Sequence, residues 1–200
     1  MARTPSIRDE TILEAARAVF LARGIQATTA EVAEHAGVSE GTLFNRFKSK
    51  DELFRAAMVS HAELIPWVAT LEERIGKGRV REHLVDLGLR IIEFFRALMP
   101  FMMMAMSNPG PDGLPRVLSQ PDPPPAMAIR KLAAYFEAEI RAGRIRKTNP
   151  QVLARAFLGG LQSFVFFELI LKGRDRAPLS AEEFAKGHVG LLWAGISPND

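Results

Sequence analysis

Apolar residues recur along this chain at helical spacing, and no stretch alternates apolar and polar residues at the period of two that marks a strand. In the first third, Ile12, Ala16, Val19 and Phe20 form one such stripe, which Gly24 follows. Glycine readily adopts the left-handed conformation that closes a helix. These positions predict a helix ending near residue 24, and the spacing as a whole predicts an all-α protein.

Capping residues predict where the next helices begin. A Ser or Thr followed three residues later by Asp or Glu satisfies free N–H groups at a helix start. The pattern occurs at Ser6 with Asp9, Thr28 with Glu31, Ser49 with Glu52, and Ser180 with Glu183. We expect short helices over 29–36 and 40–47, separated by Gly37 and the cap Ser39. A fourth helix begins after residue 49 and runs toward residue 75, with a bend at Pro66.

Longer helices are predicted in the remainder of the chain. Gly76 to Gly78 interrupts it, and more than half of the prolines lie between residues 109 and 125, which predicts a loop over 108–125. Asn149 followed by Pro150 is a helix start. The expected helices cover 79–98, 100–106, 126–142, 150–172 (with Gly173 behind it) and 181–194. Together these make about nine helices, arranged as an N-terminal head (residues 6–60) and a larger C-terminal body (residues 61–196).

Residues 28–47 have the spacing of a helix-turn-helix motif, with two short helices joined through a glycine turn. Apolar residues of both helices can fill the inside of such a unit: Val32, Ala33, Ala36, Val38, Leu43 and Phe47. The second helix carries Thr42, Asn45 and Arg46 on another face. Polar side chains of this kind read base edges in the major groove of DNA. Similar helical hairpins that bind no DNA are the alternative.

Charge alone does not identify the partner of this motif. The net charge is only +3, and acidic and basic residues balance over residues 1–60. Basic side chains are instead concentrated in residues 1–8 and 45–50, which contain no acid. Binding through so narrow a stripe would have the salt dependence of a handful of phosphates per subunit.

The motif also resembles the DNA-binding segment of the tetracycline-repressor-like (TetR) family of bacterial transcription regulators. The match runs through Thr28, Val32, Ala33, Ala36, Gly37, Val38, Ser39, Gly41, Thr42, Leu43, Phe44, Phe47, Ser49, Lys50 and Leu53. The resemblance implies a homodimer with a three-helix DNA-binding head and a helical ligand-sensing body. It implies phosphate contacts at Thr28, Phe44 and Lys50, although the family usually has tyrosine where this chain has Phe44. The expected DNA-binding residues are Thr28, Ser39, Glu40, Gly41, Thr42, Phe44, Asn45, Arg46, Lys48 and Lys50.

A methionine-rich stretch, LMPFMMMAM at residues 98–106, is the first indication of a ligand pocket. Methionine is flexible and polarizable and adapts to irregular apolar shapes, although ordinary core packing explains it equally well. The candidate lining residues are Trp67, His83, Phe94, Met99, Met102, Met103, Met106, Phe136, Phe157 and Gln162. Phe95 and Tyr135 are further candidate walls, and His61, Arg90 and Glu168 are further polar neighbours.

The segment 156–171 is apolar nearly all round and should be buried on more than one side. A second copy of the chain is the simplest partner for its outer side, and the alternative is the central helix of a monomer. The residues expected at a dimer interface are Gly159, Gly160, Ser163, Phe164, Phe167, Leu171, Val189, Leu192 and Trp193.

Catalytic and metal-binding motifs are missing from the sequence. It contains no cysteine, and its four histidines have no metal-ligand spacing. There is no glycine-rich phosphate loop and no nucleophile motif. We therefore predict that the protein is not an enzyme and has neither a cofactor nor a metal site.

Residues 1–30 lack the apolar core of a secretory signal, and segment 156–171 is shorter than the ~20 residues of a membrane span. The sequence therefore predicts a cytoplasmic transcription regulator with no membrane contact. It is expected to be a repressor, released from a palindromic operator by a small, largely apolar ligand. The alternatives are a ligand-independent regulator whose body only dimerises and a helical carrier of hydrophobic ligands.

Overall fold

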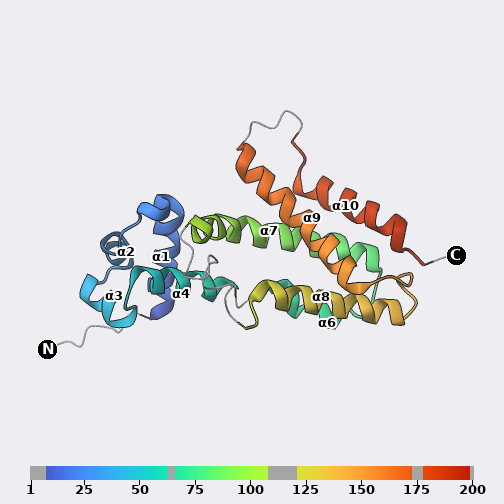
Figure 1. Cartoon of the computed structure of the whole chain (residues 1–200), viewed down its shortest axis with the longest axis horizontal. Coiled ribbons are helices and arrows are strands. Elements are labelled where there is room, and N and C mark those ends of the chain that lie inside the picture. Colours follow the sequence, from blue (N-terminus) through green and yellow to red (C-terminus); the bar gives the residue numbers. More distant parts are fainter. Residues whose placement is uncertain (1–7, 63–65, 108–120, 173–177, 199–200) are drawn as a thin grey trace. The chain divides into compact units, whose positions relative to one another are not determined.

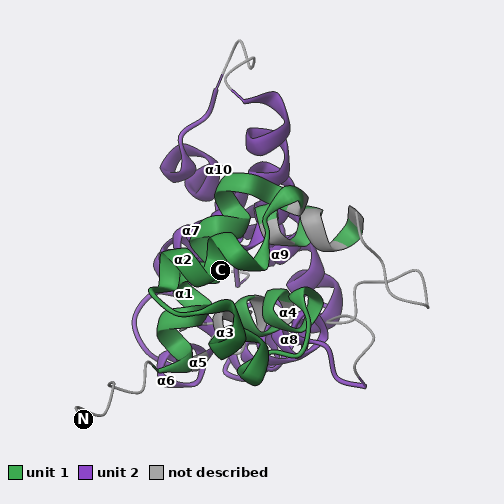
Figure 2. Cartoon of the chain, turned by 90° about the vertical axis from the view of Figure 1, so that its left-hand side faces the viewer, with its two compact units in different colours: residues 1–64, 100–120 green, residues 65–99, 121–200 purple. Residues whose placement is uncertain are grey.

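The computed structural model describes residues 8–62, 66–107, 121–172 and 178–198, and every regular element within them is a helix (Figure 1). The chain divides into two compact units (Figure 2). The first unit comprises residues 1–64 and 100–120, and the second comprises residues 65–99 and 121–200. The all-α class predicted from the hydrophobic spacing is therefore confirmed.

The first unit contains α1 (Asp9–Arg23), the short 3-10 helix η1 (Gly24–Gln26), α2 (Thr29–Ala36), α3 (Glu40–Arg46) and α4 (Lys50–Ala62). Helix α1 contacts both α2 and α4, and α2 contacts α3. Their shared core contains residues that the sequence pattern places inward: Ile12, Ala16, Val19, Phe20, Val32, Ala33, Leu43 and Phe47. It also contains Ala27, Leu53 and Ala57, which the pattern did not single out.

The predicted caps of α2 and α3 are present. Thr28 and Glu31 form a reciprocal capping box, and the Ser39 hydroxyl accepts a hydrogen bond from the Thr42 N–H. Gly37 ends α2 in the left-handed conformation, with φ 66°, a region that favours glycine. The start of α1 differs from the prediction, because Arg8 occupies its N-cap without a side-chain bond. The predicted cap Ser6 lies outside the described residues.

The second unit contains α5 (Pro66–Ala69), α6 (Leu71–Arg74), α8 (Pro124–Arg141), α9 (Pro150–Leu171) and α10 (Ala181–Ile196), together with α7 (Val80–Ser107) as far as Met99. Helix α8 packs on α5, α6 and α9, and α9 packs on α10. Asn149 caps α9 with Pro150 in its first turn, and Ser180 and Glu183 form a capping box on α10, as predicted.

Two predicted helix boundaries are wrong, and prolines lie at both. The bend predicted at Pro66 adjoins residues 63–65, which lie outside the described residues; α5 begins at Pro66, and α6 ends at Arg74. Pro100 lies inside α7 instead of beginning a new helix; the division between the two units falls at this residue. Helix α8 begins at Pro124, since proline is tolerated in a first turn where no N–H bond is lost. Residues 108–120 of the predicted loop lie outside the described residues, as does Gly173.

A buried ion pair closes the turn between α6 and α7. Glu139 of α8 is fully buried, and its carboxylate accepts hydrogen bonds from Arg144 Nε (2.6 Å) and the Gly76 N–H (3.1 Å). Arg144 also donates to the carbonyls of Lys77 and Gly78. The pair is therefore satisfied on both sides, which a charge at this depth requires.

Candidate nucleic-acid interface

Helix α3 is held in the first unit by polar contacts at both of its ends. At its N-terminus, the Thr29 hydroxyl of α2 donates a 2.8 Å hydrogen bond to the Glu40 carboxylate. The Ser39 and Thr42 hydroxyls lie 2.9 Å apart. At its C-terminus, Arg46 Nη1 lies 2.6 Å from Asp9 Oδ1 of α1. These contacts fix the orientation of the outer face of α3 relative to α1 and α2.

The outer face of α3 is accessible along its length. Asn45 and Gly41 are exposed, Phe44 is 44% exposed, and Thr42 and Arg46 are half-buried. A side chain built at Gly41 would meet only the Ser39 hydroxyl, at 3.8 Å. Leu43 and Phe47 point into the core instead. The arrangement is that of a recognition helix with polar groups and one apolar ring facing outward.

Two helix starts flank α3 and carry the predicted phosphate contacts. Thr28 is exposed at the start of α2, where its N–H and hydroxyl bind Glu31 and lower the pKa of that carboxyl. At the start of α4, the Ser49 hydroxyl accepts from the Glu52 N–H, and Glu52 accepts from the Lys48 N–H. Lys48 is exposed and Lys50 is half-buried. Basic side chains beside helix N-termini form surroundings that suit phosphate.

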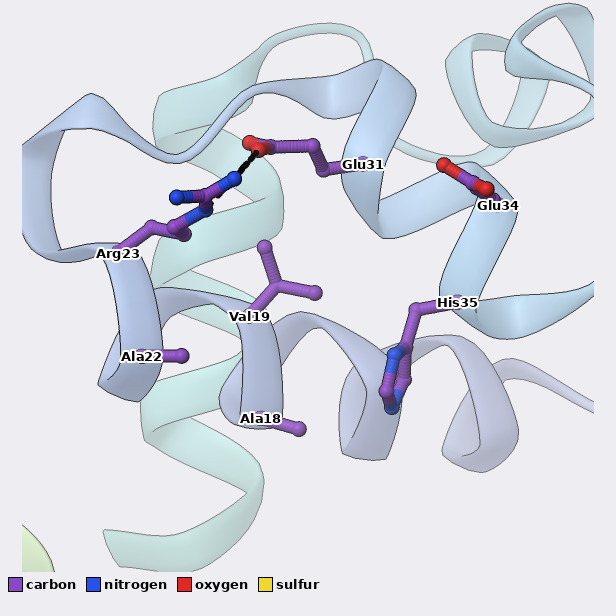
Figure 3. A pocket seen from close by; sticks show the side chains of 7 residues that line it. All are labelled: Ala18, Val19, Ala22, Arg23, Glu31, Glu34 and His35. Atoms are coloured by element: carbon purple, nitrogen blue, oxygen red, sulfur yellow. Dashed lines mark hydrogen bonds and ion pairs between the residues drawn. The ribbon is translucent and has the colours of Figure 1, made fainter.

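A hollow of about 440 Å³ lies between α1 and α2 (Figure 3). It is lined by Ala18, Val19, Ala22, Arg23, Glu31, Glu34 and His35, and it includes no residue of α3 and none of the predicted ligand residues. The Arg23–Glu31 ion pair, at 3.1 Å, spans one edge. With two carboxylates in its wall, this hollow is unsuited to phosphate.

The predicted ligand residues are divided between the two units. Met99 is buried in the core of the second unit, whereas Met102 packs against the core of the first. Met103 and Met106 are 44% and 59% exposed. The methionines are thus shared between the cores of the two units, and a role for them in ligand binding stays a prediction.

The remaining predicted ligand residues belong to the second unit. Trp67, Tyr135, Phe136 and Phe157 are buried in its core, and Phe94 and Phe95 pack against it. Gln162 is exposed, and His83 lies over the glycine turn, 2.7 Å from where a side chain of Gly78 would begin. Arg90 pairs with Asp86, and Glu168 with Arg96. The side chain of His61 lies outside the described set.

Helices α9 and α10 expose an apolar face in this single chain. Gly159, Ser163 and Phe167 of the predicted interface are exposed, and Phe164, Leu171, Leu192 and Trp193 are half-buried. Two residues have other positions. Val189 is fully buried in the chain's own core, so it has no surface to offer a partner. Gly160 makes room for the chain's own His188, with whose ring any added Cβ atom would collide.

Exposed residues that the sequence pattern did not single out enlarge this face. They are Val152, Phe166, Ile170 and Leu191, of which Leu191 is 80% exposed. The signal was present, because these residues continue the apolar pattern. However, helical periodicity does not say which of two apolar sides packs against the chain's own core.

Helix α9 is longer than the apolar segment seen in the sequence. It has 22 residues and, by length and composition alone, could cross a membrane; a third of its apolar window is buried. The apolar segment 156–171 is part of this longer helix, which begins six residues earlier, at the predicted start Pro150. Among the described residues, no group of three His, Cys, Asp or Glu side chains could hold a metal ion.

A small helical unit with an exposed recognition helix, in a chain that also contains a larger helical unit, is the arrangement of a helix-turn-helix DNA-binding regulator. Two family models match this chain: bacterial regulatory proteins of the tetR family over residues 12–57, and the C-terminal domain of AefR-like transcriptional repressors over residues 122–189. The chain belongs to the TetR family of transcriptional regulators.

Part of the chain matches a curated relative. The chain is 42% identical over 55 residues to YvkB, an uncharacterized HTH-type transcriptional regulator of Bacillus subtilis. This match covers 27% of the chain and 29% of the relative, so the chain aligns with less than a third of that protein's length.

Solved structures match nearly the whole chain. A Mesorhizobium loti protein assigned to the TetR family has a TM-score of 0.77 at 22% identity, covering 98% of this chain and all of that one. The regulator FadR of Bacillus subtilis, in complex with stearoyl-CoA, has a TM-score of 0.72 at 15% identity, covering 94% and 99%. A Clostridium perfringens protein assigned as a fatty acid metabolism regulator has a TM-score of 0.65 at 24% identity, covering 94% and 100%. At these identities the likeness concerns the fold.

Proposed function

We propose that this protein is a cytoplasmic repressor that binds a near-palindromic operator as a homodimer and leaves it when a small, largely apolar ligand binds. Residues 6–60 would form the DNA-binding domain, and residues 61–196 the ligand-binding and dimerisation domain. The observation that carries the proposal is the outer face of α3, where Gly41, Phe44 and Asn45 are exposed beside Thr42 and Arg46. This face presents polar groups at the spacing needed to read base edges.

The exposed apolar face of α9 and α10 supports the homodimer. Large apolar side chains there, such as Phe167 (54% exposed) and Leu191 (80% exposed), lie on the same two helices whose inner sides supply part of the core of the second unit. Apolar patches of this kind mark interaction sites. A protein partner fits better than a membrane, because α9 also exposes Arg155 and Gln162 and pairs Glu168 with Arg96. Charged and polar groups in a lipid-facing helix are costly.

Two of the structural neighbours suggest the class of ligand. One was solved with stearoyl-CoA, and another is assigned to fatty acid metabolism. Ligands with an acyl chain would suit a body whose core is rich in phenylalanine. Release of DNA by such a ligand requires a difference in affinity between two states of the dimer. A shift from 1:99 to 99:1 takes about 5.5 kcal/mol.

Footprinting on the DNA upstream of the protein's own gene tests the proposal, followed by anisotropy titrations with the protected site and a scrambled duplex. We expect two protected half-sites about 34–36 Å apart and an affinity that falls steeply with salt. Equal affinity for both duplexes at the same salt concentration would contradict operator recognition.

The ligand is tested separately, with decanoyl-CoA added to the protein–operator complex and free coenzyme A as the control. Release by decanoyl-CoA alone supports regulation by an acyl ligand. If neither compound releases the DNA while operator binding holds, regulation by an acyl ligand fails. A ligand-independent regulator, whose body only dimerises, would then be favoured.

A further inference from the structure

Three buried side-chain polar atoms in the second unit have no hydrogen-bond partner in the described part of the chain: the Trp67 indole Nε1, the Tyr135 hydroxyl and His83 Nδ1. Of these residues, Trp67 and Tyr135 are the most deeply buried, each only 2% exposed. Most buried polar groups in proteins are hydrogen-bonded, because an unsatisfied one costs about 1–3 kcal/mol. Two such groups in one small core therefore require an explanation.

Both groups belong to one interface inside the second unit. Trp67 lies on α5 and Tyr135 on α8, α8 contacts both α5 and α6, and the two side chains are members of the same apolar cluster. The Thr70 hydroxyl donates to the Trp67 backbone carbonyl and has no described hydrogen bond to the indole N–H. The unpaired donors thus lie where the segment 66–74 packs against α8.

The surroundings of Tyr135 favour a neutral partner over an anion. Burial is the largest cause that raises the pKa of Tyr135 far above its ordinary value, and the nearby Glu139 carboxylate raises it further. Arg74 and Arg144 act in the opposite direction, but Arg74 pairs with Asp86 and Arg144 with Glu139. The phenol therefore keeps its proton and donates a hydrogen bond. The burial and the Glu139 carboxylate that disfavour a phenolate would also disfavour a negatively charged ligand at this position.

We propose that the Trp67 N–H and the Tyr135 O–H are the donors that hold the effector, and that this effector is an apolar molecule with a neutral carbonyl oxygen. An indole N–H can only donate, and a neutral carbonyl oxygen is an acceptor without charge that suits both kinds of donor. The inference rests on the proposed function, since it assigns the ligand of that regulatory body.

The segment 66–74 is the natural place of entry. Helices α5 and α6 have four residues each, and helices this short have little stability of their own. A small shift of this segment away from α8 would open the buried face that carries these donors to a ligand. Trp67 and Tyr135 would be satisfied only in the ligand-bound state, so ligand binding would favour that state.

Calorimetric titration of the full chain with three ligands of similar size tests this assignment. Butyrophenone is a neutral ketone, butylbenzene replaces its carbonyl with a methylene, and 4-phenylbutyrate carries a carboxylate. The variants are Trp67→Phe and Tyr135→Phe, which remove one donor each and keep an aromatic ring. Thr148→Val, which removes an exposed hydroxyl of the same unit, is the control.

We expect butyrophenone to bind wild type at least tenfold more tightly than either other compound. Each phenylalanine variant should weaken butyrophenone binding by about 3- to 10-fold, the value of one hydrogen bond, and leave butylbenzene unaffected. Without ligand, both variants should melt no lower than wild type, because an unsatisfied group has been removed. Thr148→Val should bind all three compounds as wild type does.

The proposal is overturned if butyrophenone does not bind, if it binds no more tightly than butylbenzene, or if both phenylalanine variants bind it as wild type does. These outcomes are separate from the operator experiment. Release of the operator by decanoyl-CoA with unchanged butyrophenone binding in both variants would remove this site and leave the proposed function intact. If butyrophenone bound through both donors but had no effect on operator affinity, the binding site would stand and its part in regulation would be contradicted.

Discussion

Arg46, the last residue of α3, and Asp9, the first residue of α1, form an ion pair with 2.6 Å between Nη1 and Oδ1. The two residues are 37 positions apart in the chain, and Asp9 remains largely exposed. Arg46 is also a predicted reader of bases, and if it does contact a base, Asp9 and DNA would compete for the same guanidinium group. The pair connects the orientation of the recognition helix to the start of the first helix.

Arg46→Ala should weaken specific operator binding by about 1–3 kcal/mol if the guanidinium reads a base. Asp9→Asn should strengthen binding, because it removes one competitor for Arg46 and one negative charge near the DNA. Anisotropy titration at fixed salt measures both effects. Glu10→Gln is the control, since it makes the same change of charge on the neighbouring exposed residue. An unchanged affinity in Arg46→Ala would show that Arg46 only braces α3 against α1.

Gly160→Ala should destabilise the protein by about 1–3 kcal/mol, the usual cost of overpacking. The new Cβ would collide with the His188 ring, which stacks between Phe157 and Phe184 and lies 3.0 Å from the Phe157 carbonyl. Gly159→Ala is the matched control on the same helix, because no atom lies within 4 Å of its added Cβ. It should gain up to about 1 kcal/mol of helix propensity. Thermal unfolding of dilute protein distinguishes the two, and equal melting temperatures would contradict the packing described.

Leu191→Glu should convert a dimer into a monomer, since this side chain is 80% exposed on the apolar face of α10. Because so little of it is buried, the substitution should remove few contacts within its own chain. Sedimentation velocity over a range of concentrations measures the change. Leu21→Glu is the control, because Leu21 is half exposed on α1 in the other unit. Loss of the dimer in both variants, or in neither, would argue against an interface at α9 and α10.

Glu168→Gln should lower stability at neutral pH by less than about 1 kcal/mol, because the pair it breaks is partly exposed. Glu168 binds Arg96 through two hydrogen bonds of 2.7 and 2.8 Å, and this contact lowers the pKa of Glu168 below its ordinary 4.5, although burial opposes the shift. Since the folded pKa is the lower one, the stabilisation is complete above pH 4.5 and is lost as the pH falls through the folded value.

Urea unfolding of wild type and Glu168→Gln at pH 7 and at pH 3 checks this prediction. The difference between the two proteins should shrink at the acidic pH. Glu137→Gln, an exposed change on α8 without a described ion pair, should show no such pH dependence. A difference between wild type and Glu168→Gln that persists at pH 3 would mean that the carboxylate charge is not its source.

The sequence predicted those parts of the structure that depend on neighbours a few residues away. The capping boxes at Thr28 and Ser180 and the left-handed Gly37 were all foreseeable, because each is closed by residues within four positions. The same holds for the outer face of α3, whose members are set by helical spacing. The resemblance of this motif to TetR regulators was visible in the sequence for the same reason, and the family match confirms it.

The chain by itself determined the local elements, the all-α class and the recognition helix, since hydrogen bonds within one or two helical turns decide these. Only the tertiary structure showed that Arg46 meets Asp9, that Val189 is turned inward while Leu191 is turned outward, and that the methionines are divided at Pro100. It alone left Trp67 and Tyr135 without partners in the described residues. These relationships join residues far apart in the chain, and they depend on which helix faces pack together, which periodicity within a single helix does not specify.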